Sequence, residues 1–206
     1  MTLPSTHIDA ASFGFSPEAD GQTNRQALQK ALDQTGTISI SKPGTYDLSG
    51  TVYIGSYTSL ICGNGVKLRK IKEAGKPFTH IILNKGALTK QWDTGITVDG
   101  LYVEINRVDQ AMDEVYGLRG QIAFFYVRDL KILGFRCLDL AAAQFAIHVC
   151  TFEDLIVQDA IIHGNKDGVH LGRGKRFIIR DCVFNTFDDA VALNAHDYAT
   201  SNPDLG

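Results

Sequence analysis

An interval of 22 residues recurs in the second half of the chain and restricts the folds that it can adopt. Gln144, Lys166 and Asp188 stand at this interval, and similar rows of residues follow them. Each row carries two apolar residues two positions apart, the pattern of a strand with one buried face. The rows are Phe145-Ala146-Ile147-His148-Val149, Asp167-Gly168-Val169-His170-Leu171 and Asp189-Ala190-Val191-Ala192-Leu193, with Ala123-Phe124-Phe125-Tyr126-Val127 one interval earlier. A strand recurring in this way, without helical stripes between, predicts an all-β solenoid, the parallel β-helix, with about 22 residues per coil.

Residues 1–36 form an N-terminal segment with one expected helix. Thr23 and Gln26 have the spacing of a capping box at a helix start. An apolar stripe follows, and Gly36 provides a C-terminal stop. The stripe consists of Ala27, Leu28, Ala31 and Leu32. We expect this short α-helix to cap the first coil of a β-helix that occupies residues 37–206.

Short strands and turns continue to residue 105, and residues 106–120 then interrupt the pattern. The interruption carries Asp109, Asp113, Glu114 and Tyr116. This segment is either an excursion from one coil that forms one side of a binding groove, or a solvated surface loop. Regular coils extend from Ile122 to Leu193.

The composition favours neither nucleic acid nor a membrane as a partner. The 206 residues carry a formal net charge of −3 without a basic patch. No apolar run approaches the ~20 residues of a membrane span. Residues 1–11 show no signal peptide pattern. The cysteines lack metal-ligand or redox spacing, and we expect Cys137, Cys150 and Cys182 to be buried small apolar residues rather than disulfide partners.

The stretch after Leu193 contains no helix or polar cap that would close the last coil. An open solenoid end exposes apolar surface and unpaired strand edges. We therefore expect missing C-terminal coils of a longer protein, or another chain, to cover this end.

Three carboxylates stand at the start of neighbouring rows. Asp167 and Asp189 are equivalent positions, so stacked coils would bring them about 4.8 Å apart, with Asp188 adjacent. Like charges this close raise the pKa of at least one carboxyl, which can then act as a general acid while others activate water. Such a set suits hydrolysis of a glycosidic bond. The alternative role of each aspartate is to bond its own backbone at a tight turn.

Two motifs in this region resemble glycoside hydrolase family 28, the polygalacturonases and rhamnogalacturonases. Asn165-Lys166-Asp167-Gly168 resembles the family's Asn-Thr-Asp motif, and Asp188-Asp189-Ala190-Val191-Ala192-Leu193 resembles its Gly-Asp-Asp motif. The opening, from Phe13-Gly14 to Pro43-Gly44-Thr45-Tyr46, is similar to the start of many pectin-acting β-helix proteins. Lys166 replaces the family's Thr and Phe187 its Gly. The family's Gly-His-Gly and Arg-Ile-Lys motifs have no counterpart before Gly206.

The resemblance implies a right-handed parallel β-helix of the pectate-lyase-like superfamily and an inverting glycosidase of pectin or another acidic plant polysaccharide. By position, Asp188 would be the general acid, and Asp167 and Asp189 would activate water, without a metal or cofactor. The implied partner is a polysaccharide or oligosaccharide substrate. The implied location is extracellular or periplasmic, at the cell wall.

Several nearby residues are candidates for substrate binding. His148 and His170, one interval apart on the outer face, would bind sugar hydroxyls or a uronate carboxylate, or else form a stack of surface histidines. Tyr126 is expected in the same column, where it would stack on a sugar ring. Asn165 is either a binding residue or a turn residue that caps backbone groups.

Two further groups follow these strands. Arg173, Lys175 and Arg176 lie in the turn after His170, where they would meet an acidic sugar or form a solvated basic turn. His196 and Asp197 follow the strand of the paired acids, and His196 would partly replace the missing family histidine.

Two rival functions stay open at this point. A β-helix polysaccharide lyase would use Ca²⁺, which three acidic residues could bind, although no basic residue is convincingly placed as its base. A non-catalytic carbohydrate-binding or adhesin β-helix would bind the sugar without cleaving it.

Overall fold

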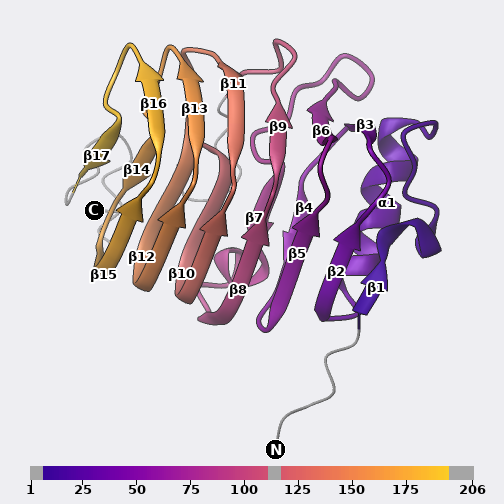
Figure 1. Cartoon of the computed structure of the whole chain (residues 1–206), viewed down its shortest axis with the longest axis horizontal. Coiled ribbons are helices and arrows are strands. Elements are labelled where there is room, and N and C mark those ends of the chain that lie inside the picture. The colour runs from indigo at the N-terminus through magenta and orange to yellow at the C-terminus, as the bar shows by residue number, and fades with distance from the viewer. Residues whose placement is uncertain (1–6, 111–116, 195–206) are drawn as a thin grey trace, which may run out of the picture.

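The chain folds into a parallel β-helix whose coils stack along one axis, with the helix α1 at the N-terminal end (Figure 1). The computed structural model describes residues 7–110 and 117–194. Within these ranges, all pairings between named strands are parallel. The solenoid predicted from the repeat is confirmed.

The elements follow one another in short segments. They are β1 (His7–Asp9), the 3-10 helix η1 (Ala10–Phe13), α1 (Gly21–Leu32), β2 (Gly36–Ile40), β3 (Gly44–Leu48), β4 (Val52–Ile54), β5 (Thr58–Cys62), β6 (Val66–Lys70), β7 (Ile82–Asn84), the 3-10 helix η2 (Lys85–Leu88), β8 (Asp93–Asp99), β9 (Tyr102–Glu104), β10 (Gly120–Leu133), β11 (Arg136–Leu140), β12 (Phe145–Gln158), β13 (Ile161–Gly164), β14 (Val169–Leu171), β15 (Gly174–Arg180), β16 (Val183–Thr186) and β17 (Val191–Leu193).

The strands make three faces around one core. One face follows the order β16-β13-β11-β9-β6-β3. The other two belong to one continuous sheet, because β10 and β12 each turn a corner. Tyr126 and Thr151 form these corners with left-handed backbone, at φ 57° and 44°. Before its corner β12 pairs with β14, and after it β12 pairs with β15.

The N-terminal helix is confirmed, but both predicted boundary residues are wrong. Asp20, not Thr23, caps the helix, and its carboxylate accepts a 2.8 Å hydrogen bond from the Thr23 N–H. The C-cap is Asp33, whereas Gly36 opens β2. The error arises because aspartate caps as well as threonine does, and Asp20 comes first.

The 22-residue interval is confirmed for the last coils, where Ile147 pairs with Val169 and Val169 with Val191. The row placed one interval earlier is wrong, because Ile122 pairs with Ile147, 25 residues on. One of the three extra residues lies at a register shift in β11 between Cys137 and Leu140, and the other two lie between Leu140 and Ile147. Ala123, and not Tyr126, therefore stands beside His148.

The interior contains a buried polar cluster around Lys70. This side chain is fully buried, and its ammonium donates to the Thr79 carbonyl, Gln121 Oε1 and Gln144 Oε1 at 2.9, 2.9 and 3.2 Å. Gln144 Nε2 also donates to the Thr79 carbonyl, at 2.8 Å. A buried charge is tolerated when its donors are all hydrogen-bonded, and these three acceptors use the three ammonium protons.

The cysteines carry free thiols, as expected from their spacing. The burial expected for Cys137 and Cys150 is confirmed, whereas that expected for Cys182 is wrong, because this thiol lies on the last described coil and is partly exposed. Burial raises the pKa of the Cys62 thiol to about 12. These cysteines are therefore packing residues in this structure.

Large apolar side chains are exposed on the last coils. They are Phe177, Ile178, Val183, Phe187 and Leu193. The cover expected over this end, whether further coils or another chain, stays a prediction.

Replacing Lys70→Met should destabilise the fold by about 3 kcal/mol or more, because buried acceptors would lose their donor. Urea unfolding followed by circular dichroism measures the change. Lys30→Met, on the exposed face of α1, is the control and should change stability by less than about 0.5 kcal/mol. Equal effects of the two changes would contradict the buried network.

Stability should also fall between pH 6.5 and pH 4 because of His80. Burial lowers the pKa of this histidine from 6.5 to about 4. In that range the unfolded chain binds a proton that the folded chain excludes, which removes up to about 3 kcal/mol. Its Nδ1–H donates to the Gly120 carbonyl at 2.7 Å, a bond that asparagine can replace. Unfolding of His80→Asn across this range should show a shallower pH dependence, and an unchanged slope would refute the assignment.

Candidate active site

The predicted carboxylates line a cleft of about 340 Å³ on the face formed by the first half of β12, β14 and β17. The residues around it are Gly117, Arg119, Phe145, His148, Lys166, Asp167, His170, Asp188, Asp189, Ala192, Leu193 and Asn194. Gly117 and Arg119 come from the described part of the 106–120 excursion. This segment therefore contributes one wall of the cleft, as one of the two expectations for it stated.

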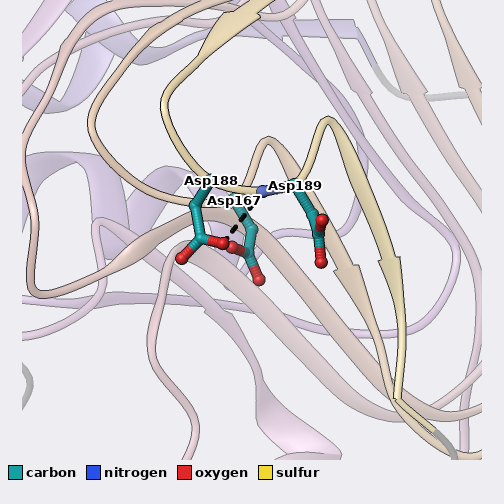
Figure 2. A group of neighbouring side chains, drawn as sticks. All are labelled: Asp167, Asp188 and Asp189. Carbon is teal, nitrogen blue, oxygen red and sulfur yellow. Dashed lines mark hydrogen bonds between the residues drawn. The ribbon is translucent and has the colours of Figure 1, made fainter.

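The stacked turns before β14 and β17 bring the three aspartates together. The Gly168 N–H donates to the Asp189 carbonyl at 2.9 Å, and the Ala146 N–H to the Asp167 carbonyl at 3.0 Å. One carboxylate oxygen from each of Asp167, Asp188 and Asp189 lies within 4.8 Å of the others. Figure 2 shows the three side chains pointing to the same side of the backbone. The predicted grouping is confirmed.

Glycine at position 168 permits this close stacking. A Cβ there would lie 2.6 Å from the Phe184 ring and 2.7 Å from the Ala190 carbonyl oxygen. Real Cβ atoms do not approach backbone oxygens this closely. A side chain at Gly168 would therefore push the two acidic turns apart.

Lys166 binds Asp188 directly. Its ammonium forms an ion pair with the Asp188 carboxylate and lies 3.8 Å from Asp167 Oδ1. The hydrogen bond from Lys166 is the largest cause that lowers the pKa of Asp188 below 3.8. The raised pKa expected for a general acid is therefore not found at Asp188, because a cation that replaces the family's Thr stands beside it.

Asp167 is the buried member of the three. Its Oδ2 lies 2.6 Å from His170 Nδ1, and its buried Oδ1 has no hydrogen-bond partner within the described ranges. His170 stacks on the Phe145 ring, with centroids 4.0 Å apart and planes 9° apart. The histidine and the phenylalanine together fix the orientation of the Asp167 carboxylate.

His148 is not the surface residue that alternation predicted. It faces away from the solenoid core, but only 2% of it is exposed. Its Nδ1 accepts a 3.0 Å hydrogen bond from the Arg119 N–H, so Nε2 carries the proton and points to Cys150 Sγ at 3.1 Å. Burial is the main reason why the pKa of His148 is well below 6.5. His148 is thus a neutral residue that supports the cleft wall.

The two histidines do not form a surface stack either. Their rings meet edge to face at a centroid distance of 5.0 Å, and both are buried. The alternation of the strand identified their side of the sheet correctly. It contained no sign of the segment that covers them.

Tyr126, Arg173 and Lys175 lie away from the carboxylates. Tyr126 packs edge to face on Trp92 and Phe125, with centroids 5.5 and 4.7 Å away. Arg173 and Lys175 line a second groove together with Trp92, and Lys175 pairs with Glu153 at 2.9 Å. Binding of an acidic sugar to Arg173 or Lys175 would therefore take place outside the cleft.

The remaining predicted residues lie beside the cleft or outside the described ranges. Asn165 is exposed in the turn before Asp167, and its N–H donates to the Leu140 carbonyl at 2.8 Å. His196 and Asp197 lie outside the described residues.

The three carboxylates have the ligand type that Ca²⁺ prefers, and their spacing fits one cation. Acidic residues also gather without an ion, and Lys166 already supplies a positive charge here. The described residues therefore do not require a metal.

Sequence comparison finds a similarity between part of the chain and a curated plant protein. The chain is 29% identical to a protein of Arabidopsis thaliana described as a probable polygalacturonase, over 120 residues that make up 54% of this chain and 26% of the relative. The chain is polygalacturonase-like. At this coverage, the chain spans only about a quarter of the length of that curated relative. No family model matches the sequence.

Solved structures show the same right-handed parallel β-helix. The tailspike protein of E. coli bacteriophage HK620, solved as a double mutant, has a TM-score of 0.72 at 17% identity, covering 93% of this chain and 38% of the tailspike. The exopolygalacturonase of Thermotoga maritima has a TM-score of 0.64 at 13% identity, with 93% and 55% covered. At these identities the likeness concerns the fold.

The described residues include no helix of the length and apolarity that a membrane span needs.

Replacing Lys166→Met should raise the pKa of Asp188, because the ammonium that stabilises its ionised form is removed. Titration of the Asp188 carboxyl carbon by NMR measures this pKa. Lys175→Met is a matched control, since Lys175 pairs with Glu153 in the other groove. If the Asp188 titration curve is the same in wild type and Lys166→Met, the ion pair does not exist in solution.

Proposed function

We propose that this chain carries the catalytic acids of an inverting glycoside hydrolase that cleaves an acidic plant polysaccharide such as pectin. The observation that carries the proposal is the meeting of three aspartates, 21 and 22 residues apart in sequence, on one side of a cleft. The polygalacturonase-like sequence supports it. The proposed location is extracellular or periplasmic.

Asp167 and Asp189 are the proposed pair that activates water. A water molecule can donate to both, because two hydrogen bonds of about 2.8 Å span oxygens that lie within 4.8 Å. His170 keeps Asp167 in place for this task through its 2.6 Å contact. In hydrolysis the water oxygen bonds to the anomeric carbon and gives one proton to the aspartate pair, while the glycosidic bond breaks and the departing oxygen takes a proton from the acid.

Asp188 is the proposed acid. Asp188 is exposed whereas Asp167 is buried, and the Asp188 side chain can reach a sugar oxygen in the cleft. Inverting enzymes typically hold acid and base ~6.5–9.5 Å apart, further than the oxygens here. Lys166 lies close to both Asp188 and Asp167 and draws them together in the free cleft.

A second candidate is a cation-dependent lyase, favoured by the 4.8 Å spacing of the three carboxylates. A lyase needs a basic residue to remove a proton. Lys166 lies in the cleft, but its ion pair with Asp188 stabilises the protonated amine, which cannot act as that base.

Asp188→Asn should lower the release of reducing ends from polygalacturonate by at least about 100-fold, the size expected for loss of a general acid. Asp181→Asn is the control, since Asp181 is exposed on the same coil outside the cleft, and it should keep near wild-type activity. Proton NMR of the first product should show an anomeric configuration opposite to that of the cleaved bond. A retained configuration would refute inversion.

Three outcomes would refute hydrolysis itself. A product that absorbs in the ultraviolet, together with loss of activity in a chelator, would identify the lyase. Binding of polygalacturonate without new reducing ends, unchanged in Asp188→Asn, would identify a binding or adhesin module. Absence of both binding and cleavage would refute this substrate class.

A further inference from the structure

Lys166 has an unusual position for a residue next to a proposed acid. Its side chain is 29% exposed, and it lines the cleft between Asp188 and Phe145. The ammonium pairs with Asp188, lies 3.8 Å from Asp167 Oδ1, and stands 5.7 Å from the centre of the Phe145 ring. It is therefore a cation at the centre of the reacting groups, within reach of any sugar that enters.

This ion pair conflicts with the task proposed for Asp188. A general acid must be protonated when the leaving oxygen departs, and an ammonium bound to its carboxylate favours the ionised form. In the free cleft Asp188 is therefore held in an unproductive state. Some event on substrate binding has to separate Lys166 from it.

An acidic sugar carries a carboxylate that can replace Asp188 as the partner of Lys166. A uronate carboxylate is chemically equivalent to the aspartate side chain, and it would enter a cleft that already contains three carboxylates. Such a group needs a cation, and among the residues that the structure describes, Arg119 and Lys166 are the lysine and arginine side chains that line the cleft. Lys166 forms ion pairs with two of the proposed catalytic acids, Asp167 and Asp188.

We propose that Lys166 recognises the carboxylate of an acidic sugar by exchanging Asp188 for it, so that substrate binding itself releases the acid. The inference rests on the proposed function, since it assigns the specificity of that same cleft. No bond to carbon changes in this step. The ammonium passes from one carboxylate to another, and the freed Asp188 then takes a proton from solvent.

Lysine suits such an exchange better than arginine. Its ammonium is a point charge on a flexible four-carbon stem, whereas the planar guanidinium holds a carboxylate through two fixed hydrogen bonds. A neutral sugar offers no carboxylate and would leave Lys166 on Asp188. The device therefore selects acidic substrates by two effects, attraction of the sugar and release of the acid.

Calorimetric binding tests the exchange without any need for turnover. The probes are a galacturonic acid trimer and its methyl ester, in which each carboxylate loses its charge and gains a methyl group. Lys166→Met should weaken binding of the acidic trimer about tenfold or more and leave the ester nearly unchanged. Lys166→Thr, which restores the residue of the family motif, should behave in the same way.

A pair of charge-removing variants separates exchange from simple attraction. Asp188→Asn removes the carboxylate with which Lys166 forms its ion pair, whereas Asp189→Asn removes an equal charge from the neighbouring position. Asp188→Asn should therefore tighten binding of the acidic trimer more than Asp189→Asn does. This excess should vanish in the Lys166→Met background.

The proposal is overturned if Lys166→Met weakens the acidic and esterified trimers equally, or if the two aspartate variants have equal effects. It also fails if the wild-type chain binds neither trimer. If binding follows the predicted pattern but no reducing ends are released, carboxylate recognition stands and the proposed hydrolysis fails.

Discussion

In-register stacking of successive coils is the constraint on which the site depends. Ile147, Val169 and Val191 form one column because parallel pairing leaves no freedom in their relative positions. The acidic turns before β14 and β17 inherit that register through the hydrogen bond from the Gly168 N–H to the Asp189 carbonyl. The carboxylates are thus positioned by sheet hydrogen bonding and do not depend on a flexible loop.

The parts of this structure that follow a repeat could be predicted from the sequence. The column of the last coils could be counted because the turns that connect β13 to β14 and β16 to β17 have equal lengths. The count failed one coil earlier, since the stretch from Cys137 to Ile147 is three residues longer than the equivalent stretch from Ile162 to Val169. Tyr126 was misplaced because the apolar neighbours Phe124 and Phe125 fit either register.

The detailed contacts of segments without a repeat could not be predicted. The burial of His148 depends on residues 117–120, whose path the strand alternation does not encode. Gly120 permits that path, because a Cβ there would lie 2.8 Å from His148 Cβ. By contrast, the contact of Lys166 with Asp188 was available in the sequence. The two residues are one repeat apart, so in-register stacking predicts that the lysine and the aspartate are neighbours.

The cleft combines two modes of carboxylate control. Asp167 is buried and oriented by His170, which stacks on Phe145, so packing fixes its position. Asp188 is exposed and is held by the flexible side chain of Lys166. Its ionisation state therefore depends on which other groups Lys166 can bind. The fold consequently determines the position of Asp167, whereas the groups present in the cleft determine the ionisation state of Asp188.

The enclosed ammonium of Lys70 has a practical consequence. Acylating reagents need an accessible, unprotonated amine, and this one is surrounded by the oxygen atoms of Thr79, Gln121 and Gln144. Its modification therefore requires the coils around it to separate. The fraction of molecules labelled at Lys70 would therefore report how often the solenoid interior opens. Labels on surface lysines would report only the exposure of those side chains.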